Sequence, residues 1–413
     1  MKVAVIGGGV SGLVCACLLS PHHDVTLFEK EPRLGGHTHT VTVHHEGRAF
    51  DVDTGFIVFN ERNYPLFCRL LDRLGVRSRT TTMSFSVHDE ANGFEYGGTS
   101  IAGAIGPCSN LLRPRWWAVA AGVATLGTRG KSLLMEAHAS DTIGDLYHSG
   151  RLSKGLLDDY LVPMAAAIWS APRDALLRFP AKFMLRFFDN HGMLDLRDRP
   201  QWRTIEGGSH AYIKAMRPSL DRCTIEHAAV ERVHRRPSVV DVSAGGTRRQ
   251  FDRVILATHS DEAIAMLADP TIDELEVLRE LPYQPNEVVL HTDASLLPRR
   301  RRCWAAWNYR LSADESAPIA VTYNMSILQG LDTRTPICVS LNAADRIAPE
   351  CIIRRHTFHH PIYTLAGDAA RARWQQISGV NCTHFCGAYW GNGFHEDGVA
   401  SAVRVCEQLG VSL

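Results

Sequence analysis

The first twelve residues contain a glycine pattern that few folds can accommodate. An apolar run, Val3–Ile6, breaks into Gly7, Gly9 and Gly12, with Ser11 inside the pattern. A buried parallel strand would deliver Gly7 to a tight turn, Gly9 would let the backbone approach a pyrophosphate, and Gly12 would let the next helix pack closely on the sheet. The open N–H groups at the start of that helix would meet the phosphates. The pattern predicts a Rossmann-type dinucleotide site.

An acidic residue at the expected distance narrows the choice of dinucleotide. A second apolar run, Val25–Phe28, ends at Glu29, and Lys30 follows it. A carboxylate about 20 residues beyond the glycines accepts hydrogen bonds from ribose hydroxyls and disfavours a 2′-phosphate. We therefore expect FAD or NAD rather than NADP, and we include Lys30 in the predicted nucleotide site.

A second glycine pair favours FAD. Arg33, Gly35 and Gly36 come directly after the ribose acid. A glycine pair behind an arginine suits a second backbone approach to a diphosphate, because the guanidinium supplies a fork of donors. A plain glycine turn is the alternative. This pattern resembles the FAD-binding half of the flavin amine oxidase and phytoene desaturase superfamily, in which the extended FAD lies along the first helix and this second glycine pair.

The resemblance extends to two segments in the middle of the chain. Residues 224–230 look like the strands whose backbone contacts adenine, which would place Val230 against the ring; an ordinary hairpin is the alternative. Residues 251–259 resemble the strand that closes flavin-binding sheets, and it ends near Ala257. Asp53–Gly55 resembles the segment that runs under the flavin ring.

A glycine-rich segment near the C-terminus, residues 385–398, supplies a further match. In the superfamily this segment returns to the nucleotide domain, and a helix N-terminus points at the pyrimidine edge of the flavin. The resemblance implies that backbone N–H groups of Asp397 and Gly398 lie there. One departure is Ala388 after Gly387, where many relatives carry an acid that binds the ribityl chain.

Four longer segments match a narrower group. They look like a family of FAD-dependent oxidoreductases associated with cyclopropane and other modified fatty acids, and they comprise residues 161–172, 187–194, 202–209 and 391–398. This resemblance implies a small-molecule, lipid-like substrate. It also implies a functional link to a fatty-acid methyltransferase or cyclopropane synthase.

The order of these motifs predicts an α/β fold with a Rossmann-type FAD-binding domain assembled from separated segments, and an α+β substrate domain beside it. The FAD-binding domain would comprise residues 1–80, 200–265 and 379–413. The substrate domain would comprise residues 81–199 and 266–378. At 413 residues and 45% hydrophobic composition, the chain can fill about two domains.

Composition excludes several classes of function. Lys and Arg together equal Asp and Glu at 44 each, so no basic field is available for nucleic acid. The eleven cysteines form no Cys-x-x-Cys pair, which fits reduced thiols in the cytoplasm, and no secretory segment precedes the first strand. His37, His39, His44 and His45 lack a Cys or acid at a ligand spacing, so we predict no metal site.

An apolar stretch raises the question of membrane contact. Trp116–Leu126 is too short to span a bilayer. It is flanked by Arg113, Arg115, Arg129 and Lys131, so it could lie at the interface and admit a lipid chain, which would make the protein peripheral at the inner membrane surface. A buried helix is the alternative. The run Arg299–Arg302 would attract anionic headgroups or a carboxylate, or form a solvated loop.

Catalytic residues are weakly marked, because a flavin itself accepts the hydride. The candidates adjoin the predicted helix start or lie in the Asn-His-Gly sequence, and they are Tyr389, Trp390, Asn392, His395, Glu396 and His191. The leading hypothesis is a desaturase or oxidase that passes a hydride from an apolar, fatty-acyl or lipid-like substrate to flavin N5. The alternatives are a flavin amine oxidase with Tyr389 and Trp390 in an aromatic cage, a non-redox double-bond isomerase, and a binding module.

Overall fold

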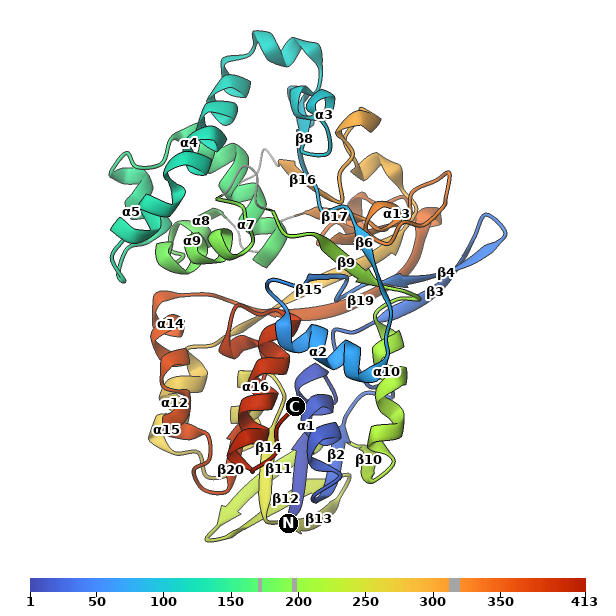
Figure 1. Ribbon diagram of the computed structural model, residues 1–413, viewed down its shortest axis with the longest axis vertical. Helices are drawn as coiled ribbons and strands as arrows, with labels where there is room; N and C mark the ends of the chain where they lie inside the picture. Colours follow the sequence, from blue (N-terminus) through green and yellow to red (C-terminus); the bar gives the residue numbers. More distant parts are fainter. Residues whose placement is uncertain (170–172, 195–198, 312–319) are drawn as a thin grey trace.

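The computed structural model describes residues 1–169, 173–194, 199–311 and 320–413, and it shows two halves stacked along the long axis of the molecule (Figure 1). The lower half contains both the N-terminal strand and the C-terminal helix. The upper half combines a mixed sheet with a group of helices. Residues 170–172, which end one of the segments matched above, lie outside the described residues.

A five-stranded parallel sheet forms the centre of the lower half. Its strands lie in the order β10 (Cys223–His227), β2 (Asp24–Glu29), β1 (Lys2–Ile6), β14 (Arg253–Leu256) and β20 (Thr383–Phe385). Every neighbouring pair is parallel. The interior of the central strands is apolar, from Val3 to Ile6 in β1 and from Val254 to Leu256 in β14, because both faces of a parallel sheet are covered. The predicted Rossmann-type unit, assembled from separated segments, is confirmed.

Strand β10 is not part of a hairpin with the segment that follows it. It pairs with β2 in the parallel sheet, whereas the next strand begins a separate three-stranded antiparallel sheet. That sheet consists of β11 (Val230–Arg236), β12 (Val239–Ala244) and β13 (Thr247–Phe251). Val230 is therefore the first residue of a new sheet, at the end of the connection from β10.

Two helices cover the nucleotide end of the parallel sheet, α1 (Val10–Leu19) and α16 (His395–Gln408). Their close packing depends on glycine. A Cβ on Gly12 would lie 1.8 Å from the carbonyl oxygen of Gly7, and a Cβ on Gly398 would lie 2.8 Å from Val10. Gly7 itself has φ +106°, a conformation that side chains rarely adopt. These contacts fix the glycine-rich turn at the sheet edge.

A seven-stranded mixed sheet and a helical group form the upper half. The strands lie in the order β19 (Ile352–Pro361), β15 (Tyr283–His291), β18 (Cys338–Leu341), β17 (Val321–Asn324), β16 (Trp307–Leu311), β7 (Phe85–Asp89) and β8 (Phe94–Gly97). The helical group contains α3 (Ile101–Ile105), η1 (Cys108–Leu112), α4 (Pro114–Glu136), α5 (Ile143–His148), α6 (Lys154–Leu156), the π-helical turn η2 (Leu157–Leu161), α7 (Val162–Trp169), α8 (Arg173–Leu177) and α9 (Ala181–Asn190). Among the described residues, no helix is long and apolar enough to cross a membrane.

Other elements flank the two large sheets. They include the hairpin β3 (Thr40–His45) and β4 (Arg48–Asp53) and a small sheet of β5 (Val58–Asn60), β9 (Trp202–Ile205) and β6 (Ser78–Thr81). The helices α2 (Pro65–Leu74), α10 (His210–Met216) and α11 (Ser260–Met266) add apolar residues to the core of the lower half, and α13 (Met325–Leu328) adds them to the core of the upper sheet.

The two cores do not follow the domain boundaries expected from the motifs. Helices α12 (Ile272–Arg279), α14 (Leu365–Ala372) and α15 (Trp374–Ile377) fall in the range expected for the substrate domain, yet their apolar residues belong to the core of the lower half. Conversely, the β3–β4 hairpin contributes Val41 and Val52 to the core of the upper sheet. The chain therefore crosses between the halves more often than the motifs indicate.

Candidate active site

A cavity of about 1600 Å³ lies between the two halves. Its lower wall contains the glycine-rich turn after β1, the end of β2 and the end of β14, and its upper wall contains α4, α7, α9 and the mixed sheet. Ordinary small-molecule sites measure about 300 to 1,000 Å³. The cavity therefore has room for an extended dinucleotide together with a second molecule.

The two glycine pairs meet at the lower wall. The N–H of Gly35 donates to the carbonyl of Gly8 at 2.8 Å, and a Cβ on Gly36 would lie 3.1 Å from the Cα of Gly9. Gly9 is the N-cap of α1, with no side-chain cap and no atom within 4 Å of where its Cβ would stand. The first N–H groups of α1 lack intrahelical partners and border the cavity. This arrangement fits a diphosphate.

Most of the other predicted nucleotide residues also border the cavity. Glu29 accepts hydrogen bonds from the N–H of Gly8 at 2.7 Å and the N–H of Glu31 at 2.9 Å. Lys30 pairs with Glu262 at 2.6 Å. The guanidinium of Arg33 donates to the carbonyls of Gly36 and Thr38, so it folds over its own loop. The cavity-lining residues that the sequence predicted are Gly7, Gly9, Ser11, Glu29, Lys30, Arg33, Gly35, Gly36, Val230 and Ala257.

A comparison with protein-family models agrees with an FAD site. The family described as flavin containing amine oxidoreductase matches residues 10–302, which is more than half of the chain. The chain belongs to this family. It is therefore an FAD-dependent oxidoreductase, as predicted. No protein of curated function matches the sequence significantly.

Several solved structures share the fold over almost the whole chain. A CLA-producing fatty acid isomerase from P. acnes is 17% identical, with a TM-score of 0.69 and 98% of each chain covered. A putrescine oxidase variant is 16% identical, with a TM-score of 0.70, over 99% of this chain and 98% of that one. Cyclohexylamine oxidase from Brevibacterium oxydans is 14% identical, with a TM-score of 0.67 and 99% of both chains covered. At these identities the likeness shows the fold alone.

In this family member, the start of α16 differs from the expectation. Helix α16 begins at His395, so Asp397 and Gly398 lie inside its first turn. The Asp397 carboxylate accepts a hydrogen bond from the N–H of Phe394 at 2.9 Å. The N–H of Gly398 donates to the carbonyl of Phe394 at 3.1 Å. Neither residue lines the cavity in the described structure, and the Gly398 N–H is already used within the helix.

Glu396 points away from the cavity and caps another helix. Its carboxylate accepts hydrogen bonds from the N–H groups of Leu66 at 3.0 Å and Phe67 at 2.8 Å, at the start of α2. Burial raises the pKa of this carboxyl. A carboxylate that accepts hydrogen bonds from two backbone N–H groups at a helix N-terminus caps that helix and stabilises it. Glu396 is not among the described residues that line the cavity.

His395 faces the cavity and is held rigidly. Its ring stacks on Phe56 with the centroids 3.6 Å apart. Its Nε2 lies 3.0 Å from both Thr38 Oγ1 and the hydroxyl of Tyr212. Burial lowers the pKa of His395 to about 3, so the imidazole is neutral at pH 7. Its surroundings suit orientation rather than proton donation.

His191 also lines the cavity, from the end of α9. Its Nδ1 lies 2.8 Å from the carbonyl oxygen of Phe187. Burial lowers its pKa to about 4, so the ring is neutral, and because a carbonyl only accepts, Nδ1 carries the hydrogen. The Nε2 lone pair is then free to accept a proton. The ring stacks on Phe187 at 3.9 Å, which fixes that orientation.

The aromatic pair near the C-terminal segment does not form a cage. Tyr389 lines the cavity, whereas neither Trp390 nor Asn392 does so in the described structure. The rings of Tyr389 and Trp390 are 5.1 Å apart and inclined by 39°, so they pack on each other instead of facing across a gap. Burial raises the pKa of Tyr389 well above its usual range.

Strand β19 brings a group of polar residues to the cavity that the motifs did not reveal. Arg354, His356, Phe358 and His360 all line it. The Asn286 side-chain amide donates to Nδ1 of His360 at 2.9 Å, which leaves the proton of the neutral ring on Nε2. Burial lowers the pKa of His360 to about 4. The sequence of β19, with adjacent arginines and adjacent histidines, has no alternation that would have indicated this position, and Arg355, Thr357 and His359 line the cavity as well.

Proposed function

We propose that this FAD-dependent oxidoreductase acts on an apolar, fatty-acyl or lipid-like substrate. The observation that carries the proposal is the chemistry of the upper part of the cavity. Its wall is mostly apolar and includes Val119, Val123, Met164, Ile168, Phe187, Met193 and Trp202. Among the described lining residues, the only carboxylates belong to Glu29, Glu31 and Glu262, which lie at the nucleotide end. An apolar chain fits such a wall, and a diamine dication finds no counter-ion there.

An exposed arginine that lines the cavity can orient an acyl substrate. Arg199 lies near Tyr160, where its charge lowers the pKa of the hydroxyl that burial raises. A fatty-acid carboxylate could pair with this guanidinium while its chain extends along α4 and α7. The pairing would fix which carbon of the chain reaches the cofactor.

The cofactor-binding residues that we propose follow from the lower wall. The N–H groups after Gly9 would hold the pyrophosphate, Glu29 the ribose and Val230 the adenine. When bound, FAD supplies the hydride acceptor. The protein's part is to orient the substrate and to exclude water, and the Nε2 lone pair of His191 can take a proton from it.

Anaerobic mixing tests the proposal. The holoenzyme would be mixed with saturated and unsaturated fatty acids, their methyl esters, monoamines and diamines, while the flavin absorption band is followed. We expect bleaching by a member of the acyl group and none by the diamines. Bleaching by amines alone would overturn the proposal and favour an amine oxidase. Oxygen readmitted afterwards separates an oxidase, which releases hydrogen peroxide, from a dehydrogenase that needs another acceptor.

A second candidate function is double-bond isomerisation of a fatty acid without net oxidation. Two observations favour it: the same apolar cavity, and a fold that is shared with a fatty acid isomerase over 98% of both chains. In the same experiment, a shifted double bond with no lasting loss of the flavin band identifies this activity. Either outcome would fit a functional link to a fatty-acid methyltransferase or cyclopropane synthase, because such an enzyme uses or produces modified acyl chains.

A further inference from the structure

The upper end of the molecule exposes an apolar tip, formed by α3, η1 and the first turns of α4 (Figure 1). Three large side chains project there: Ile101 is 84% exposed, Leu112 is 88% exposed and Trp117 is 56% exposed. Side chains of this kind gather here more than on the rest of the described surface, where they are scattered. An exposed apolar cluster of this kind marks an interaction surface.

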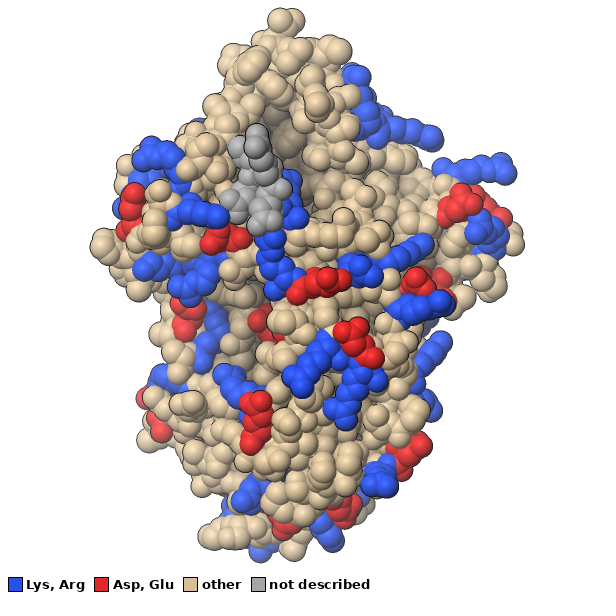
Figure 2. All heavy atoms as spheres, in the orientation of Figure 1, with Lys and Arg blue, Asp and Glu red and all other residues tan. Residues whose placement is uncertain are grey.

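Basic residues lie beside the tip, and acidic residues are missing from its sequence. Residues 99–135 and 294–309 contain no Asp or Glu, and the second range holds Arg299–Arg302. The two ranges touch, because Cys303 Sγ lies 3.9 Å from the Gly103 carbonyl oxygen. Figure 2 shows the tip without red atoms on its visible face and with blue atoms along one side.

Part of the positive charge is free to act on a partner. Arg300 pairs with Glu95 at 2.7 Å, and Arg301 lies over the Trp304 ring. Arg299 and Arg302 are exposed, and no carboxylate within the described parts of the chain pairs with either guanidinium. These two arginines are the strongest candidates for contact with an anionic surface.

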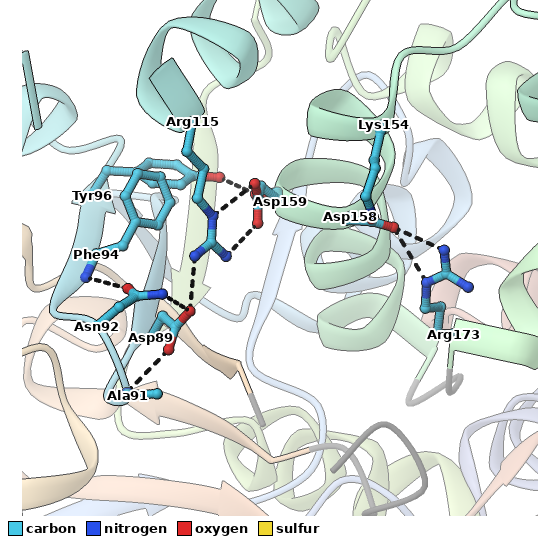
Figure 3. A network of polar contacts seen from close by, with 10 residues as sticks. All are labelled: Asp89, Ala91, Asn92, Phe94, Tyr96, Arg115, Lys154, Asp158, Asp159 and Arg173. Carbon is cyan, nitrogen blue, oxygen red and sulfur yellow. Dashed lines mark hydrogen bonds and ion pairs between the residues drawn. The ribbon is translucent and has the colours of Figure 1, made fainter. Parts of the chain in front are cut away.

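Arg115, which the sequence placed among the flanking charges, has a different role. Its guanidinium bonds to both carboxylate oxygens of Asp159 at 3.0 and 2.7 Å, and to Asp89 at 2.9 Å (Figure 3). It also covers the ring of Phe94. This clamp ties the start of α4 to the β7–β8 hairpin and to η2, so the tip stands on a rigid base while the Arg115 charge is used internally.

The tip borders the cavity. Ala104 is exposed and also lines the cavity, as do Trp116 and Ala120. The Trp116 indole N–H donates to the carbonyl of Ala104 at 2.9 Å, which joins α3 to α4 at this edge. Figure 2 shows the surface hollowed beneath the tip. An apolar molecule leaving a bilayer would therefore meet the cavity without crossing water.

We propose that this tip docks on an anionic lipid surface, with Ile101, Leu112 and Trp117 inserted at the headgroup level and Arg299 and Arg302 against the headgroups. Tryptophan beside aliphatic side chains and arginine is the combination that favours an interfacial position. The proposal explains how a lipid-like substrate would arrive, and to that extent it rests on the proposed function. The docking itself requires no turnover.

Vesicle co-sedimentation of the FAD-loaded enzyme tests the docking. We expect binding to phosphatidylglycerol–phosphatidylcholine vesicles and weak binding to pure phosphatidylcholine. Ile101→Ser/Leu112→Ser/Trp117→Ser should lower the partition coefficient by about tenfold or more. A matched control, Ile272→Ser/Ile353→Ser/Val380→Ser, removes exposed apolar side chains elsewhere and should bind like the parent. Equal loss in both variants, or no dependence on the tip, would overturn the proposal.

Two double variants separate attraction to the headgroups from insertion of the apolar side chains. Arg299→Gln/Arg302→Gln should weaken binding to anionic vesicles and reduce the salt dependence of that binding. The control Lys214→Gln/Arg217→Gln removes two exposed charges from the lower half and should leave binding unchanged. Light scattering in the absence of lipid tests whether the tip instead binds a second copy of the chain. A dimer that dissociates in the triple tip variant would assign the tip to self-association and overturn docking on lipid.

Flavin bleaching by soluble acyl substrates is measured separately. Failure of docking and failure of the proposed substrate class are therefore distinguishable.

Discussion

The hydroxyl of Tyr212 lies 3.0 Å from Nε2 of His395. The same hydroxyl is 2.6 Å from Thr38 Oγ1, so three buried polar groups from the second glycine loop, α10 and the start of α16 satisfy one another. A buried polar group without a partner is costly, and this triad avoids that cost while pinning an imidazole at the cavity wall. The triad joins three distant segments at one side of the cofactor site.

The first prediction concerns acid stability. The folded-state pKa of His395 is about 3, below the value of about 6.5 in an unfolded chain. As the pH falls below about 6.5, the His395 imidazole becomes protonated in the unfolded state but stays neutral in the folded state. The free energy of unfolding therefore decreases toward acid, by up to about 1.4 kcal/mol per pH unit. The check is the urea midpoint between pH 8 and 5. His395→Gln should flatten the dependence, and His148→Gln, on the surface, should not.

The second prediction separates folding from cofactor binding at the glycine turn. Gly12→Ala places a Cβ 1.8 Å from a backbone oxygen, so it should prevent a stable fold. Gly9→Ala has φ −74° and open space, so the melting temperature without FAD should stay near that of the parent. Its methyl group should nevertheless raise the FAD dissociation constant by about tenfold. Normal FAD affinity in Gly9→Ala would contradict the placement of the pyrophosphate.

The third prediction tests whether Glu396 is catalytic. Glu396→Gln removes a charged cap from α2 and should cost about 1 kcal/mol of stability, measured by thermal or urea unfolding. The turnover number should stay within about twofold of the parent, because the carboxylate faces away from the cavity. Glu407→Gln, exposed on the same helix, serves as the control for helix propensity. A large fall in the turnover number with unchanged stability would contradict this prediction and indicate a catalytic role for Glu396.

The fourth prediction concerns Arg199. Arg199→Gln should raise KM for free fatty acids by about tenfold and leave KM for the methyl esters unchanged, since only the acid offers a carboxylate. Arg178→Gln, exposed in the turn after α8 and outside the cavity lining, should change neither KM. Equal effects on acid and ester would show that Arg199 shapes the cavity without pairing with the carboxylate.

The parts of the site that sequence could predict are those set by local backbone geometry. The spacing of Gly7, Gly9 and Gly12 predicts a strand, a turn and a helix within a dozen residues. The structure has β1 before this turn and α1 after it. The contact between Thr38 and Tyr212 spans 174 positions, and nothing in either neighbourhood indicates the other. Likewise, nothing in the sequence of β19 shows that it would bring Arg354, His356 and His360 to the cavity, because that placement depends on the pairing of β19 with the distant strand β15. The contacts of Glu396 could not be foreseen for a similar reason, because its partners lie 330 and 329 positions away.

Strand β20 has a consequence for how the protein forms in the cell. It is the edge strand beside β14, and α16, which follows it, supplies the wall against which α1 packs. During synthesis, residues 2–29 cannot complete their sheet until residues 383–408 have left the ribosome. The apolar faces of β1 and α1 therefore stay partly uncovered while the intervening residues are made, and such surface is prone to aggregation. FAD capture would then follow the synthesis of residues 383–408.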